Sequence, residues 1–440
     1  MPVVVLLHAV LPQRWQNPFL LLASLVFYAW GDARRLPLFL ALLAADWGIG
    51  LLLDRAEGRR QKRFLLFLGC LISFGALLFY KYSAFLLGIF GLAPAFVRGL
   101  TLPLGISFFT FQAAGYLIDV YRGETKPEKS LVAFGAFIFL FPQLIAGPIV
   151  RYGPMREALH RRRRPDAAAL DGGMALFAVG LAAKVLLANP LGAMYEALRA
   201  YPGDMACAWL SLVGYSLQIY FDFMGYSVMA VGLGRMLGFS FPRNFRHPYA
   251  AVSVTDFWRR WHITLSGWFR DYVYIPLGGN RRGKTRTVLH LAVVWLLTGL
   301  WHGADWTFVL WGLWYFVLLA AEKLLFGKRK APAPLTRAGT LILVMLGWAL
   351  FASDGLAAFR AYLADLFSFR AGPQALFWLR ENAALLLVSL MCCVPGIVEG
   401  LKRFCRERGW ARLTATAALL ILSIAALAKS TYNPFLYFRF

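Results

Sequence analysis

The chain carries little charge for its length. Only 15% of its 440 residues are charged, whereas 60% are hydrophobic and the mean hydropathy is +0.59. A water-soluble protein of this length could not cover so much apolar surface with so few charged side chains. Apolar runs long enough to cross a bilayer recur from end to end, so the sequence predicts a polytopic membrane protein.

Acidic residues are scarce relative to basic ones. The chain has 22 Asp and Glu against 46 Lys and Arg, which gives a formal net charge of +24. In a soluble protein this excess would suggest nucleic acid, but the sequence has no nucleic-acid reader motif. Basic loops hold a membrane protein against the anionic cytoplasmic leaflet. We therefore expect membrane lipids, and no nucleic acid, among its partners.

Cysteines are few and define no site. None has metal-ligand spacing, so we expect neither a bound metal nor a disulfide framework; the five are Cys70, Cys207, Cys392, Cys393 and Cys405. A cleavable signal peptide is not evident either. Residues 1–10 are apolar without a basic start or a small-residue cleavage site, and we assign them to the first membrane element.

Long apolar segments predict an all-α bundle of about 11–14 membrane helices, which forms one domain over residues 1–440. Some shorter segments are expected to lie in the membrane interface or to re-enter the membrane. The candidate spans are roughly 18–30, 36–53, 64–80, 84–97, 104–121, 131–150, 173–195, 204–220, 221–237, 288–304, 305–326, 339–353, 382–396 and 413–428. An even number of spans separates successive basic clusters, so all can face the cytoplasm: 55–63, 161–164, 235–286, 328–330 and 402–412. The aromatic tail, residues 430–440, would then emerge on the extracytoplasmic side.

Residues 238–287 contain no span and are rich in aromatic and basic side chains. Spacings of three and four place one apolar set on a single helical face: Trp258, Trp261, Leu265, Trp268 and Tyr272. A polar stripe lies beside it: Thr255, Arg259, His262, Ser266 and Arg270. Ser253 followed by Asp256 resembles a helix-starting box. The pattern predicts a cytoplasmic interfacial helix, whose role could be purely structural.

His302 is the main candidate for chemistry. It lies within LTGLWHGADWTFVLWGLW, residues 297–314, where polar groups are costly and mark functional sites by default. Burial disfavours the imidazolium, so we expect a neutral ring able to act as a general base. Gly299 and Gly303 permit close helix approach or a local break. Asp305, one turn away, could orient the ring or could be a solvated helix-end carboxylate.

His262 is the second candidate, because it lies between Arg259 and Ser266 on the polar stripe. Headgroup contact is its alternative role. The remaining histidines have no accompanying constellation, and we expect them to be structural: His8, His160, His247 and His290.

The loop GGNRRGKT, residues 278–285, fits the Walker A pattern letter for letter. That motif needs a preceding core strand inside a nucleotide-binding α/β domain, and the sequence predicts no such domain, so we do not expect an NTPase. The basic loop could still hold the phosphates of an anionic cofactor.

Several stretches together show a family resemblance. DFWRRWHITLSGWFRDYVYIPLGGN followed by LTGLWHGADWTFVLWG resembles the signature of the membrane-bound O-acyltransferase family, in its bacterial alginate O-acetyltransferase branch. Residues 102–124, 141–152 and 218–234 agree with it. The branch usually has an acidic residue where this chain has Val228, which weakens a detailed assignment of the acceptor.

The resemblance implies a helical bundle around a central tunnel, in the bacterial cytoplasmic (inner) membrane. It assigns His302 to the near-invariant catalytic position and His262 to a second, less strictly kept one. It implies acetyl-CoA, or another acyl-CoA, as donor substrate, with no permanently bound cofactor. Basic residues suited to its phosphates are Arg259, Arg270, Arg281, Arg282 and Lys284.

The terminus FLYFRF has two interpretations: an aromatic belt at the interface, or an aromatic motif that resembles FLYxxF of envelope-acylation proteins. The second makes Tyr437 a possible acyl relay, which His302 helps to charge. The acceptor would be an extracytoplasmic glycan. A separate periplasmic or anchored O-acyltransferase would complete the transfer.

An intramembrane transporter is the alternative from a different class. Ionisable residues in apolar segments could form a proton or solute path: His302, Asp305, Asp119 and Asp222. The sequence shows neither internal repeats nor paired broken helices, which count in favour of such proteins. We therefore favour the acyltransferase.

Overall fold

The computed structural model describes the chain apart from residues 1, 93, 146, 282, 327–331 and 430–440. The regular structure of the described residues is entirely helical, so the predicted all-α class is confirmed. The chain forms two compact units. Unit 1 is Met1–Phe177 with Met229–Pro242, and unit 2 is Ala178–Val228 with Arg243–Phe440.

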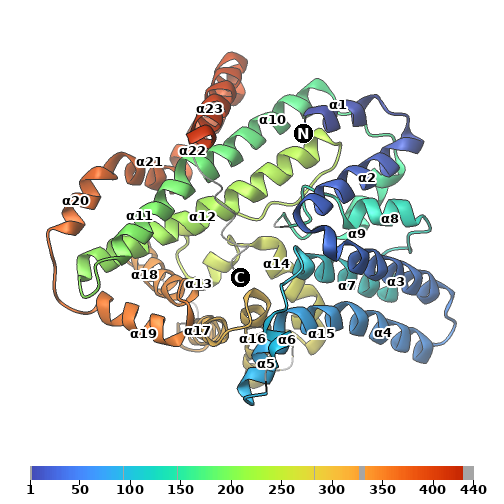
Figure 1. Cartoon of the computed structure of the whole chain (residues 1–440), viewed down its shortest axis with the longest axis horizontal. Coiled ribbons are helices and arrows are strands. Elements are labelled where there is room, and N and C mark those ends of the chain that lie inside the picture. The colour runs from blue at the N-terminus through green and yellow to red at the C-terminus, as the bar shows by residue number, and fades with distance from the viewer. Residues whose placement is uncertain (1, 93, 146, 282, 327–331, 430–440) are drawn as a thin grey trace. The chain divides into compact units, whose positions relative to one another are not determined.

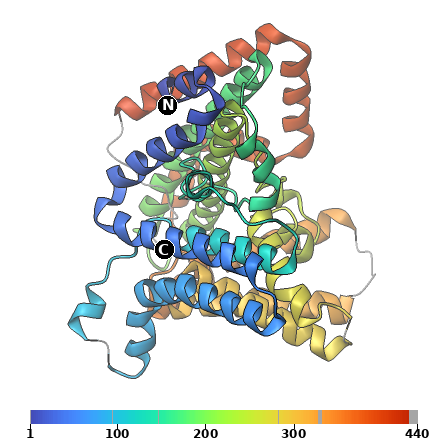
Figure 2. The same cartoon turned by 90° about the vertical axis from the view of Figure 1, so that its right-hand side faces the viewer.

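Unit 1 is built around α7 (Ile106–Arg122), which is buried on nearly all sides. Its sequence is apolar around most of the helix, as a helix surrounded by others requires. It lies beside α3 (Leu36–Arg55) and α4 (Arg59–Leu77), as Figures 1 and 2 show. The other helices of the unit are α1 (Pro2–Val10), α2 (Gln13–Asp32), η1 (Ala33–Arg35), η2 (Leu78–Tyr82), α5 (Ser83–Ile89), α6 (Ala95–Arg98), α8 (Leu131–Ile138) and α9 (Tyr152–His160).

Two long helices, α10 (Ala167–Ala182) and α12 (Met205–Met236), contribute residues to both units. Unit 2 also contains the antiparallel pair α16 (Lys284–His302) and α17 (Trp306–Ala321). Its other helices are η3 (Ala183–Ala188), α11 (Asn189–Arg199), η4 (Pro248–Ala250), α13 (Val254–Trp258), α14 (Ile263–Phe269), η5 (Arg270–Tyr274), α15 (Ile275–Leu277), η6 (Glu322–Phe326), α18 (Ala333–Phe351), α19 (Gly355–Leu366), α20 (Gln374–Glu381), α21 (Ala383–Cys393), α22 (Pro395–Glu407) and α23 (Gly409–Lys429).

Six helical stretches of the described residues are long and apolar enough to cross a membrane, or seven if the bent pair α20–α21 is one span. The predicted multi-pass membrane protein is therefore confirmed. The count is below the predicted 11–14. The predicted spans 18–30 and 36–53 fall in one helical stretch, Gln13–Arg55, and other candidate segments form shorter helices such as α7 and α8. The predicted spans 204–220 and 221–237 are one continuous helix, α12. The helix continues through the charged residue Asp222, which forms an ion pair with Lys184.

Two predicted spans are broken. The segment 84–97 forms the short helices α5 and α6, and 131–150 is helical only as far as Ile138. Turns follow that residue, where Pro142 and Pro148 cannot continue a helix.

The single interfacial helix expected within 238–287 is wrong. The segment forms five short helices, η4, α13, α14, η5 and α15, with a break after Trp258, before α16 begins at Lys284. The five aromatic and leucine side chains predicted to face headgroups are buried inside unit 2 instead. The predicted helix start is confirmed, because the Ser253 hydroxyl accepts a hydrogen bond from the Asp256 backbone N–H at 3.1 Å.

Candidate functional site

The hairpin of α16 and α17 positions His302 at the end of α16. The two helices approach closely at Gly299 and Gly312. A Cβ on Gly299 would lie 2.4 Å from the Phe308 carbonyl oxygen, and one on Gly312 would lie 2.3 Å from that of Trp295. The close approach predicted for Gly299 therefore occurs. Gly303 ends the helix in an extended conformation, so the predicted local break also occurs.

Aromatic rings surround the His302 imidazole, which is 5% exposed. Its ring centroid lies 4.9 Å from that of Trp311 and 5.3 Å from that of Phe351, both edge to face. The Trp301 ring is 5.0 Å away. Such a site is poor in water, which disfavours a charged ring and favours neutral imidazole.

Asp305 caps the N-terminus of α17. Its carboxylate accepts hydrogen bonds from the backbone N–H of Thr307 at 2.8 Å and from the Thr307 hydroxyl at 2.9 Å. These bonds are those of a helix-end carboxylate, one of the two alternatives that the sequence left open. The orienting role towards His302 stays a prediction.

His262 occupies the break between α13 and α14. It is 1% exposed and has a left-handed backbone, with φ of 43°. Its ring packs edge to face on Phe223, with centroids 4.7 Å apart, and 5.8 Å from the ring of Trp301. Neither ring nitrogen has a hydrogen-bond partner among the described residues. Burial lowers the pKa of His262 to about 3, so the ring is neutral near pH 7.

The structure brings the two predicted histidines to one side chain. Trp301 contacts the His262 ring and the His302 ring. His262 and His302 are 40 positions apart in the sequence, so no local sequence pattern could show that both contact Trp301.

A cleft of about 1380 Å³ lies within unit 2. Four members of the predicted polar stripe line it: Thr255, Arg259, Ser266 and Arg270. The fifth, His262, is absent from the lining, because the helix break turns it into the protein. Buried Trp258, Trp295 and Thr298 form the inner wall. Thr298 lies one helical turn before His302 on α16, on the same face.

His302 itself is not part of the cleft lining. The Trp311 ring links His302 to the cleft wall. It contacts His302 and also the wall residues Trp258 and Trp295. The cleft thus ends at an aromatic wall that borders the imidazole.

The basic residues predicted for phosphate binding separate into two groups. Arg259 and Arg270 line the cleft, whereas Arg281 and Lys284 are exposed outside its lining. Arg282 lies outside the described residues. Arg270 already forms a two-bond ion pair with Asp271, at 2.6 and 3.0 Å.

Lys323 is a lining residue that sequence reasoning missed. It donates a hydrogen bond to the Asn280 side chain at 2.5 Å, in the basic loop. The position of Lys323 at the end of a long apolar run was the sequence feature that could have indicated it. Glu322 also lines the cleft, but it caps α13 by accepting bonds from Val254 and Thr255.

The Walker-like loop has a helical context. It follows the short helix α15, with Gly278 and Gly283 at positive φ, and it precedes α16. The strand that a phosphate-binding P-loop requires is not the element before it.

The remaining predicted residues are spread through the chain. In unit 2, Asp222 of α12 forms a buried ion pair with Lys184. In unit 1, Asp119 is buried near the end of α7. Tyr437 lies outside the described residues, and its role stays a prediction.

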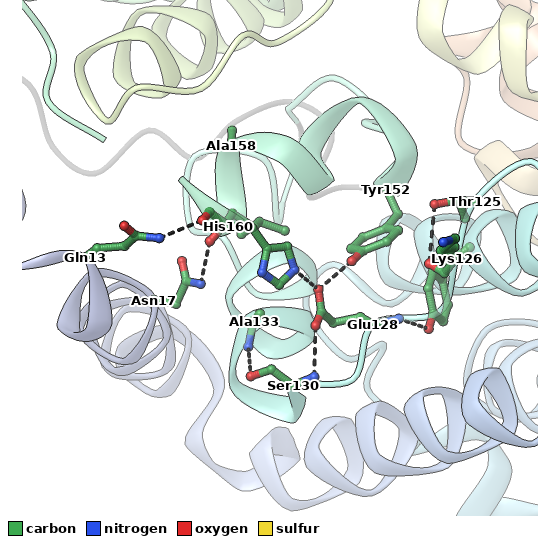
Figure 3. A network of polar contacts seen from close by, with 12 residues as sticks. Gln13, Asn17, Thr125, Lys126, Glu128, Ser130, Ala133, Tyr152, Ala158 and His160 are labelled. Carbon is green, nitrogen blue, oxygen red and sulfur yellow. Dashed lines mark hydrogen bonds and ion pairs between the residues drawn. The ribbon is translucent and has the colours of Figure 1, made fainter. Parts of the chain in front are cut away.

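A second polar cluster, in unit 1, was not predicted (Figure 3). The Glu128 carboxylate, 2% exposed, accepts hydrogen bonds from the Tyr152 hydroxyl at 2.5 Å and the Ser130 backbone at 2.9 Å. The His160 ring nitrogen lies 2.6 Å from the same carboxylate. His160 is therefore a structural residue that pairs with Glu128, and the residues around it in the sequence did not indicate this partner.

Comparison with known proteins gives consistent matches. Residues 128–351 match the profile of the MBOAT, membrane-bound O-acyltransferase family. The chain is 36% identical to the probable alginate O-acetylase AlgI of Pseudomonas putida, over all of this chain and 98% of that protein. It is 42% identical to the probable alginate O-acetylase AlgI of Pseudomonas aeruginosa, over 84% of this chain and 73% of that protein. It is 30% identical to a peptidoglycan O-acetyltransferase of Helicobacter pylori, over all of this chain and 95% of that protein.

Proposed function

Because the chain belongs to the membrane-bound O-acyltransferase family and is an O-acyltransferase, we propose that it takes an acetyl group from cytoplasmic acetyl-CoA and passes it across the membrane. The acceptor is an extracytoplasmic polysaccharide or cell-wall glycan. The names of the relatives, which act on alginate and peptidoglycan, support this class of acceptor.

One observation carries the proposal: a cleft with a basic rim ends one helical turn from His302. Arg259, Arg270 and Lys323 supply the positive charge, and Thr298 with two tryptophans supplies the inner wall. The phosphates of acetyl-CoA cannot enter hydrocarbon, so the nucleotide stays at the rim. The thin pantetheine arm then extends inward, with the acetyl group nearest His302.

The chemistry follows from a neutral imidazole in a site with little water. His302 accepts the proton of the attacking hydroxyl, whose oxygen forms a bond to the thioester carbonyl carbon. The carbon–sulfur bond breaks, and the proton passes to the departing sulfur. The products are an acetyl ester and free CoA. For the acetyl group to reach His302 from the cleft, the Trp311 ring must move aside, since it packs against both His302 and the cleft wall.

The attacking hydroxyl in this proposal is that of Tyr437. Its ester would carry the acetyl group to the extracytoplasmic side, where a separate acyltransferase transfers it to the glycan. The motif FLYFRF supports this role.

The test uses purified full-length protein in lipid nanodiscs with acetyl-labelled CoA. We expect CoA release and protein-bound label in the wild type. His302→Ala should abolish both, because the proton acceptor is gone. Tyr437→Phe removes one oxygen and should abolish the bound label.

A matched control is His290→Gln, on the same helix as His302, which should release CoA as the wild type does. Solute or proton flux without thioester cleavage in vesicles would support the transporter instead. Undiminished label in Tyr437→Phe would eliminate the relay and leave the donor and the base in place.

A further inference from the structure

The left-handed turn at His262 is held by a segment nearly twenty residues earlier in the chain. The Asn244 backbone carbonyl accepts a hydrogen bond from the Ile263 N–H at 3.0 Å. Its side-chain oxygen accepts two more, from the Thr264 hydroxyl at 2.6 Å and the Thr264 N–H at 3.3 Å. Both residues that follow His262 are therefore bound to Asn244.

A further bond fixes the other side of the turn. The Arg246 N–H donates to the Arg260 carbonyl at 3.0 Å. The segments 244–246 and 260–264 are thus paired on both sides of His262. Without this pairing, the aromatic periodicity around 258–268 favours one uninterrupted helix.

The turn carries strain that the pairing must offset. A left-handed backbone at a residue other than glycine is disfavoured, and such residues cluster at functional sites. Asn244 is 2% exposed, so its bonds are shielded from water. In the helical alternative the stripe would place His262 beside Arg259 and Ser266 in the cleft wall, away from Trp301.

We propose that Asn244 is a positioning residue for acyl transfer. By holding residues 263 and 264, it keeps the His262 ring against Trp301, on the side shared with His302, with both ring nitrogens unpaired. A buried ring without a hydrogen-bond partner is costly unless a ligand or substrate supplies one. This inference rests on the proposed function.

The test measures CoA release and protein-bound label from acetyl-labelled CoA in nanodiscs. Asn244→Leu has a similar size but no acceptor oxygen. We expect kcat for CoA release by this variant to fall ~10-fold or more, while KM for acetyl-CoA stays within ~2-fold of the wild-type value. Asn244→Asp restores an oxygen that can accept both Thr264 bonds, and should recover to within ~5-fold of the wild type.

A double-mutant cycle separates positioning from general stability. If Asn244 acts through His262, then Asn244→Leu has no further effect in the His262→Ala background. Ser130→Ala, which removes a comparable capping bond from α8 in unit 1, is the control and should keep the wild-type rate.

Thr264→Val provides a second variant if Asn244→Leu fails to fold. It removes the hydroxyl that donates to Asn244 and should slow labelling ~2–5-fold, again with no effect in the His262→Ala background. Wild-type labelling by both variants, or an undiminished defect in that background, would overturn this inference alone. Equal labelling by His302→Ala and the wild type would instead overturn the proposed function.

Discussion

In unit 1 the buried Glu128 carboxylate has hydrogen-bond donors on both oxygens, whereas in unit 2 the buried His262 ring has no partner on either nitrogen within the part of the chain that the structure describes. Both groups are almost fully shielded from water. The difference is in what surrounds them: Tyr152, Ser130 and His160 supply polar atoms to Glu128, while Phe223 and Trp301 supply ring faces and edges to His262.

This contrast separates a structural polar group from a candidate functional one. A satisfied polar network fixes a conformation and leaves nothing for a ligand to bind. An unpaired polar atom costs roughly 1–3 kcal/mol and persists only where another requirement maintains it. Unpaired buried polar atoms occur among the described residues of both units, and those of unit 2 include the Tyr315 hydroxyl and the Trp311 indole N–H. They border the aromatic wall between the cleft and His302.

Replacing a tyrosine with phenylalanine should therefore change the free energy of unfolding by different amounts at these two sites. Tyr152→Phe removes a bond to the Glu128 carboxylate and should lower stability by about 1.5–3 kcal/mol. Tyr315→Phe removes a hydroxyl that has no hydrogen-bond partner among the described side chains and backbone, and should change stability by less than about 0.5 kcal/mol, or raise it. Thermal unfolding of both variants in nanodiscs measures the difference. Equal losses would mean that the Tyr315 hydroxyl has a structural role, and the contrast would fail.

The burial of His262 predicts a loss of stability in acid. Its folded pKa is about 3, against 6.5 for an unperturbed histidine. As the pH falls below about 6.5, the unfolded chain binds a proton first, so the folded state loses stability, by about 1.4 kcal/mol at pH 5.5. Melting temperatures between pH 7.5 and 5.5 should fall more steeply for the wild type than for His262→Asn.

Asparagine suits that test because it tolerates the left-handed backbone without titrating. His290→Asn is the matched control and should follow the wild-type curve. Identical curves for the wild type and His262→Asn would show that His262 gains a partner or water in solution.

The smallest effect should separate the two cleft arginines. Arg259 has no ion-pair partner among the described residues, whereas Arg270 is held by Asp271. A free guanidinium is available for a phosphate, so Arg259→Ala should raise KM for acetyl-CoA ~5-fold, about 1 kcal/mol. Arg270→Ala should raise it ~2-fold or less. Steady-state CoA release measures both, and the reverse order would contradict the link between unpaired groups and ligand binding.

Local patterns predicted those parts of the site that depend on one helix. The glycines around His302 indicated close packing and a helix end, and both occur at Gly299 and Gly303. Four residues of the polar stripe share a cleft wall, because short helices on each side of the break keep part of the helical spacing. The continuous helix through His262 was wrong, because bonds from Asn244 outweigh the local preference.

Composition and apolar runs alone determined that the chain is an all-helical membrane protein, and short motifs alone indicated which histidines to examine. Only the tertiary structure decided that His262 and His302 contact the same indole, that Arg259 reaches a cleft while Arg281 does not, and that His160 serves Glu128. Periodicity reports on residues within a few turns of each other. The contacts of a site join residues tens of positions apart, and these depend on how whole helices pack.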